Sequence, residues 1–106
     1  MTIRSPESHA VYWPRGRTTV SAQPLAPRLD TLEGKTIAFL WDYIFRGDEI
    51  FPMIEAQLQQ RFPNMRFIGY DEFGSTHGDE ERTILQGLPE RLKALKVDAV
   101  ISGMGC

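Results

Sequence analysis

The chain has 106 residues and a formal net charge of −2, a length that allows one domain at most. Its composition, 42% hydrophobic and 25% charged, is that of a globular protein, and its slight acidity argues against a nucleic-acid-binding surface. No apolar run reaches the roughly 18 residues of a membrane span, and the first residues lack the apolar core of a secretory signal. We therefore expect a cytoplasmic protein that binds neither nucleic acid nor membrane.

The chain contains one cysteine, Cys106, which is its last residue, and two histidines, His9 and His77. A single cysteine cannot form an internal disulfide, and this set of side chains is too small for a zinc site of the usual spacing. We expect no metal and no other cofactor.

Residues 1–30 differ in composition from the rest of the chain. They hold four of the seven prolines, and their four arginines outnumber their two acidic residues. Their apolar residues follow no period, which is typical of an extended arm, with a short strand near residues 18–21, or of a disordered tail. Tyr12, Trp13 and Val20 favour an arm that packs on something, because solvated linkers rarely carry such side chains.

Residues 31–106 alternate between strand and helix patterns. Residues 35–41 (KTIAFLW) are nearly all apolar, which predicts a strand buried on both faces. An amphipathic helix follows, with Asp48 as its N-cap and its end at Pro63.

Residues 65–70 (MRFIGY) predict a second strand, which is followed by a polar loop over residues 71–78. A leucine-faced helix starts at residue 79 and is kinked or restarted at Pro89. Residues 97–102 (VDAVIS) predict a third strand, and Gly-Met-Gly-Cys ends the chain.

This order of elements implies parallel strands joined by right-handed crossovers. We predict an α/β fold, namely a three-stranded parallel half of a doubly wound, Rossmann- or flavodoxin-like sheet. An apolar third strand is poorly suited to an uncovered edge. Residues 31–106 are therefore expected to be an incomplete α/β half-domain, completed by a second chain or by further residues of a longer protein.

Ligands of open α/β sheets bind beyond the carboxyl ends of the strands. That rule brings the loops after the three predicted strands to one rim. The candidate contacts for a small-molecule substrate are Asp42, Arg46, Ser102, Gly103 and Gly105. Arg46 suits a bidentate contact with an anionic group, and a surface ion pair with a loop acid is the alternative.

Two residues of this rim are candidates for catalysis. Cys106 lies in a glycine-rich loop, where the N-terminus of a following helix would stabilise its thiolate; the alternative is an incidental terminal residue. His77 is either a proton carrier near neutral pH or a solvated loop residue. Gly103 and Gly105 match only part of a dinucleotide-binding loop, so a tight turn is the simpler explanation of them.

Two segments resemble the UGSC-motif family of selenoproteins and their cysteine homologues. They are residues 32–36 (LEGKT), before the first strand, and residues 97–105 (VDAVISGMG), which lead to the reactive loop. The resemblance runs from Thr31 to Cys106 and leaves out the arm. Family members continue with selenocysteine or cysteine and then Gly-Ser-Cys, which this sequence lacks. Cys106 therefore matches either the reactive position or the residue just before it.

The resemblance implies a thiol or selenol redox site, akin to the selenoprotein subunits of reductases that act on small amines. Selenocysteine is encoded by a codon normally read as stop, so gene prediction would truncate a selenoprotein at this point. We expect a redox protein, or the N-terminal part of a reductase-like enzyme, that acts on a small molecule. The alternative is a non-catalytic α/β subunit or interaction module that completes the sheet of a partner subunit or of another copy.

Overall fold

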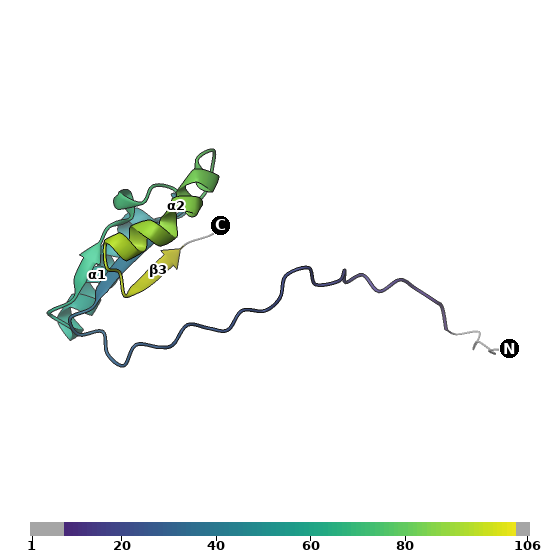
Figure 1. The fold of residues 1–106 in the computed structure, drawn as a ribbon, viewed down its shortest axis with the longest axis horizontal. Coiled ribbons are helices and arrows are strands. Elements are labelled where there is room, and N and C mark those ends of the chain that lie inside the picture. Colours follow the sequence, from purple (N-terminus) through teal and green to yellow (C-terminus); the bar gives the residue numbers. More distant parts are fainter. Residues whose placement is uncertain (1–7, 104–106) are drawn as a thin grey trace.

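The computed structural model describes residues 8–103, which contain a three-stranded parallel sheet and two α-helices (Figure 1). The strands are β1 (Thr36–Trp41), β2 (Arg66–Ile68) and β3 (Ala99–Gly103), in the spatial order β2-β1-β3. Helix α1 (Gly47–Arg61) connects β1 to β2. The short 3-10 helix η1 (Tyr70–Glu72) and helix α2 (Glu81–Ala94) connect β2 to β3. The predicted α/β class and parallel sheet are confirmed.

Strand β1 is the buried centre of the sheet. All six of its residues are buried, and it pairs with a strand on each side. Thr36 lies opposite Arg66 of β2, and Trp41 lies opposite Gly103 of β3. The nearly continuous apolar run in the sequence is explained by this burial, because a central parallel strand is covered on both faces.

The two helices cover opposite faces of β1. Phe39 and Trp41 pack with Phe51 of α1, whereas Ala38 and Leu40 belong to a cluster that includes Leu88, Leu92 and Leu95 from the α2 side. Successive side chains of a strand point to opposite faces, so a single apolar strand supplies the core of both layers.

The start of β3 is joined to β1 by a reciprocal pair of hydrogen bonds. The Asp98 N–H donates to the Thr36 carbonyl at 2.9 Å, and the Thr36 N–H donates to Oδ2 of Asp98 at 2.9 Å. This pair lies at the beginning of the register that ends with Trp41 opposite Gly103. It therefore helps to set which residues of β1 and β3 reach the carboxyl edge together.

The start of α1 differs from the prediction. The N-cap is Arg46 and not Asp48, because the Arg46 carbonyl accepts from the N–H groups of Glu49 (3.1 Å) and Ile50 (2.9 Å). Asp48 instead lies in the first turn, where its charge is favourable toward the helix dipole.

The later elements also have shifted bounds. β2 ends at Ile68 and not at residue 70, because the chain turns there into η1. Helix α2 begins at Glu81 and continues through Pro89, so the expected restart is absent. Strand β3 begins at Ala99, two residues later than predicted, and includes Gly103.

Residues 8–30 form an extended arm that runs away from the α/β body (Figure 1). The expected strand near residues 18–21 is absent, and these residues are exposed. Tyr12, Trp13 and Val20 are 100%, 75% and 74% exposed, so the packing that their apolar character suggested is not made within this chain. Neither helix within residues 8–103 has the length and apolar content needed to cross a membrane.

We predict that Asp98→Ala lowers the free energy of unfolding by about 1 kcal/mol, because the part-buried Thr36 N–H loses its acceptor. Urea denaturation followed by circular dichroism measures the change. Glu55→Ala, which removes an exposed carboxylate of α1, is the control and should stay within about 0.5 kcal/mol of the parent. Equal losses of unfolding free energy in the two variants would show that the hydrogen bond between Thr36 and Asp98 does not stabilise the fold.

Candidate functional site

The carboxyl ends of the strands meet at one rim of the sheet. Trp41, the last residue of β1, pairs with Gly103 of β3 on one side and forms an isolated parallel bridge with Ser75 on the other. After β2 the chain leaves the sheet through η1 and returns at Ser75, where the Thr76 N–H donates to the Trp41 carbonyl at 3.1 Å. The segments after β1 and β2 therefore lie beside the end of β3.

Ser75 joins the loops that follow β1 and β2. Its hydroxyl donates to the His77 carbonyl at 2.6 Å, and the Asp42 carbonyl is a second acceptor at 3.3 Å. The His77 N–H donates back to the Ser75 hydroxyl oxygen at 3.2 Å. The backbone of His77 is thus held near Asp42, while the histidine side chain is exposed.

The loop between β1 and α1 is folded over the indole of Trp41. The indole N–H donates to the Phe45 carbonyl at 3.2 Å, and the Tyr43 ring stacks on the indole with 4.5 Å between centroids. The Asp42 carboxylate accepts from the Ile44 N–H at 3.1 Å, which closes an Asx turn. These contacts hold Tyr43 at φ 63°, a left-handed conformation that such a residue rarely adopts.

Gly47, the first residue of α1, lies directly against the same indole. A Cβ atom at this position would come within 2.5 Å of Trp41 ring atoms, so only glycine allows the helix to start this close to the end of β1. The amino end of α1 is therefore placed at the rim by the packing of one aromatic ring.

Tyr43 and Tyr70 form the aromatic wall of the rim. Their rings meet edge to face at 5.4 Å, and both contact Trp41. Burial raises the pKa of the Tyr43 phenol above its usual value, and the neighbouring Tyr70 and the charge of Asp71 raise this pKa further. The Tyr43 hydroxyl, which is protonated at neutral pH as in any tyrosine, therefore keeps its proton to a higher pH than usual.

The residues predicted to contact substrate come from two places in the chain. Asp42 and Arg46 follow β1, whereas Ser102, Gly103 and Gly105 lie at or after the end of β3. Asp42 is half-buried and its carboxylate is already used in the Asx turn. Arg46 is exposed and forms an ion pair with Glu49 at 3.7 Å, within its own helix turn. On β3, Ser102 is exposed and Gly103 is half-buried. Gly105 lies outside the described residues.

Cys106, the predicted nucleophile, also lies outside the described residues. His77, the second predicted catalytic residue, is placed at the rim by its backbone, as described above. Within residues 8–103, no group of three or more His, Cys, Asp or Glu side chains is arranged to hold a metal ion.

The sequence placed Ser75 and Tyr43 in the loops of this rim but indicated no role for either residue, and it did not indicate the contact between Tyr43 and Tyr70. Ser75 lies at the rim because the chain returns to the sheet there after η1 and forms a bridge to Trp41. The two tyrosines are 27 positions apart, and their rings come together beside Trp41, which both of them contact. The one visible indication was the alternation of aromatic residues at the end of β1 and just after it, namely Trp41, Tyr43 and Phe45.

Gly47→Ala is expected to destabilise the protein by about 1–3 kcal/mol, because the added methyl group overlaps the Trp41 indole. Gly87→Ala makes the same change inside α2, where a Cβ atom meets nothing within 4 Å. It should stabilise the protein by about 0.5–1 kcal/mol through helix propensity. Thermal and urea unfolding of both variants test this, and changes of the same sign would refute the close packing of Gly47.

Tyr43 should titrate above the ordinary tyrosine range near 10, as its raised pKa requires. Because the pKa of Tyr43 is higher in the folded state than in the unfolded state, folding favours the protonated phenol. The protonated phenol therefore contributes fully to stability below the unfolded-state pKa, and this contribution is lost as the pH rises through the folded-state pKa. In a spectrophotometric pH titration, the Tyr43→Phe variant should lack the part of the phenolate absorbance that appears at the highest pH. The control Tyr12→Phe, on a fully exposed arm residue, should retain that part.

Comparison with known proteins gives one match. No curated protein and no solved structure is similar at a significant level. The UGSC family model matches residues 10–106, and so extends into the arm, beyond the Thr31 at which the resemblance in the sequence began. A match over almost the whole length shows that this chain belongs to the UGSC family.

Proposed function

We propose that this chain is a thiol- or selenol-dependent redox protein, or the N-terminal part of a reductase-like enzyme, with Cys106 as its reactive residue. The observation that supports this most directly is the pairing of Trp41 with Gly103 at the carboxyl ends of β1 and β3. Helices α1 and α2 cover opposite faces beside these strands. The chain passes from β1 outward to β2 through α1 and then back across β1 to β3 through α2. A reversal of strand order of this kind is a topological switch point, where doubly wound proteins bind ligands.

The strand order supports the same assignment. The order β2-β1-β3 is the beginning of the flavodoxin-like order 2-1-3-4-5, in which the binding crevice lies between β1 and β3. We infer that the chain is the first half of such a sheet. Cys106 follows Gly103 by three residues, a span of about 11 Å at most, so the thiol is within reach of this crevice.

The simplest reaction for a single thiol is exchange with a small-molecule disulfide. The Cys106 thiolate attacks one sulfur, a new S–S bond forms, and the substrate S–S bond breaks. The electron pair of the broken bond leaves on the departing sulfur, which takes a proton from a His77 imidazolium. A low-molecular-weight thiol, the reductant, then gives its proton to His77 and attacks the substrate-side sulfur of the mixed disulfide. Cys106 is released as the thiolate, and the reductant is left joined to the substrate fragment in a new disulfide.

The rim residues have distinct roles in this proposal. Arg46 is exposed beside the amino end of α1, where its guanidinium can bind a carboxylate of the substrate in exchange for its weak contact with Glu49. Ser102 and Gly103 offer backbone groups at the end of β3, and Asp42 shapes the facing loop. A selenol adjacent to Cys106 in a longer chain would carry out the same attack in place of the thiol.

A non-catalytic role as a sheet-completing subunit is the second candidate. β3 is an edge strand within the described residues, and its Val100 is 38% exposed. An apolar edge strand of this kind is suited to pairing with a strand of another subunit.

The rate of Cys106 alkylation as a function of pH distinguishes these functions. For the redox function we expect a midpoint below the ordinary thiol value of about 8.5, and a mixed disulfide with a small carboxylated disulfide, detected by mass spectrometry. Arg46→Ala should slow that mixed-disulfide formation by about tenfold or more, whereas Arg82→Ala, on an exposed residue of α2, should not. A midpoint near 8.5 together with no mixed disulfide would favour the sheet-completing role.

A further inference from the structure

Because of the arm, this chain has far more exposed surface than a protein of its mass normally has. Its accessible surface is 9273 Å², whereas a globular monomer of 12.1 kDa exposes about 6,000 Å². Its radius of gyration is 21.5 Å, against about 13 Å for a globular domain of this length. The excess, of about 3,000 Å², is larger than the roughly 800 Å² that each partner contributes to a stable interface.

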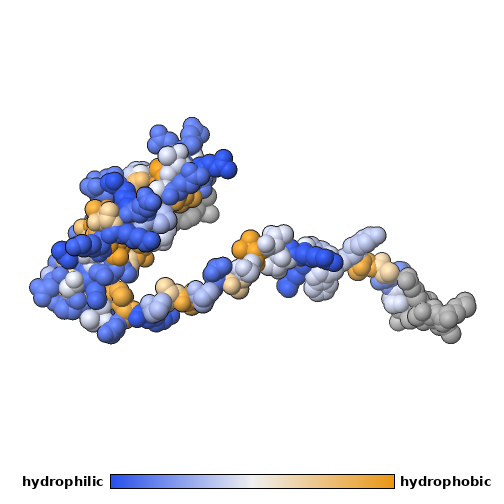
Figure 2. Space-filling view, viewed as in Figure 1, coloured by the Kyte–Doolittle hydropathy of each residue, from blue (hydrophilic) through white to orange (hydrophobic). Residues whose placement is uncertain are grey.

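The exposed surface of the arm is apolar and aromatic as well as basic. Val11, Tyr12 and Trp13 are consecutive and are 85%, 100% and 75% exposed. Figure 2 shows hydrophobic and hydrophilic residues alternating along the arm, clear of the body. The family match begins at residue 10, so this segment belongs to the part of the chain that matches the family model.

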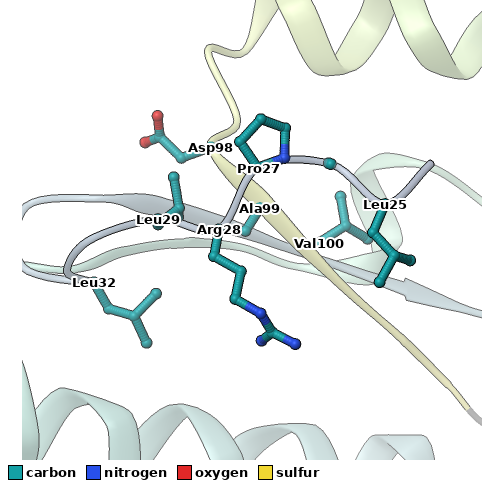
Figure 3. A pocket seen from close by; sticks show the side chains of 9 residues that line it. Leu25, Pro27, Arg28, Leu29, Leu32, Asp98, Ala99 and Val100 are labelled. Atoms are coloured by element: carbon teal, nitrogen blue, oxygen red, sulfur yellow. The ribbon is translucent and has the colours of Figure 1, made fainter.

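A groove able to receive such a segment lies where the arm joins the body. It has a volume of about 570 Å³ and is lined on one side by residues of the segment 25–32 and on the other by Asp98 and the first two residues of β3. Figure 3 shows Leu25, Leu29 and Leu32 around it, with Val100 on the β3 side and the Arg28 side chain extending beside them. The leucine and valine side chains suit an aromatic ring, which gains from burial and from a cation–π contact with Arg28, while the Asp98 carboxylate can accept from a basic side chain.

The charges of the two surfaces are complementary. Residues 11–17 of the arm carry Arg15 and Arg17 and no acidic residue, whereas the groove is lined by one cation, Arg28, and one anion, Asp98. Arg15 and Arg17 closely follow the aromatic pair in the arm. The acidic residues Asp30 and Glu33 directly follow two groove residues, Leu29 and Leu32, so an aromatic side chain in the groove would bring the arginines toward these carboxylates.

We propose that residues 11–17 of one copy bind in this groove of a second copy, which gives a dimer with exchanged arms. The arm leaves its own groove at Leu25 and runs away from its own body (Figure 1), so residues 11–17 are presented to another molecule. Two-fold symmetry lets each copy donate one arm and one groove. With about 150–250 Å² buried for each aromatic side chain, the two reciprocal contacts reach the area of a stable dimer.

Sedimentation velocity of the full chain over a dilution series tests this proposal. We expect a dimer that weakens with added salt, because the arginine contacts are screened. The variant Tyr12→Ser/Trp13→Ser should weaken dimerisation by about tenfold or more, whereas the control Thr19→Ser/Gln23→Ser, in the same arm, should not. A monomer at every concentration, or a dimer that the aromatic substitutions leave unchanged, overturns the proposal.

Cross-linking identifies which groove is used. In a Cys106→Ser background, copies with Trp13→Cys are mixed with copies carrying Val100→Cys and are oxidised. A disulfide-linked heterodimer supports the exchanged arm. If a chain carrying both substitutions instead forms the disulfide within a single monomer, the arm folds back on its own groove and the proposal is wrong. Because these readouts do not use the thiol chemistry of Cys106, they stand or fall separately from the redox function.

Discussion

The packing around the Trp41 indole is the interaction on which the geometry of the rim depends. This one side chain contacts Tyr43, Phe51 and Tyr70, holds the loop after β1 through the Phe45 carbonyl, and requires glycine at position 47. A large aromatic ring at the end of a central strand can reach the next loop, the next helix and the neighbouring strand connection at once. The start of α1 and the aromatic wall are therefore coupled through a single residue.

The position of β1 explains why so short a chain can form two layers of core. Its residues alternate between the α1 face and the α2 face, so each helix packs on the same strand from the opposite side. The same arrangement brings the end of β3 beside the end of β1. The core and the candidate site are thus two consequences of one parallel pairing, and the reach of Cys106 from Gly103 is the basis of the proposed chemistry.

The α/β body and the arm differ in how their apolar side chains are covered. In the body, apolar side chains are removed from water by the sheet and the helices. In the arm, equally apolar side chains remain exposed, and no periodic pattern would let them cover one another. Association between copies would bury these side chains without any change in the body.

The apolar run over residues 35–41 and the helical spacing of the later leucines were enough to predict the class of fold, because periodicity reports burial directly. The order of the elements along the chain was equally evident. The tertiary structure alone decided that Arg46 caps α1, that Ser75 returns to pair with Trp41, and that Tyr43 meets Tyr70. Those features depend on contacts between distant residues and on the space beside one indole ring, neither of which a local pattern of hydrophobic and polar residues records.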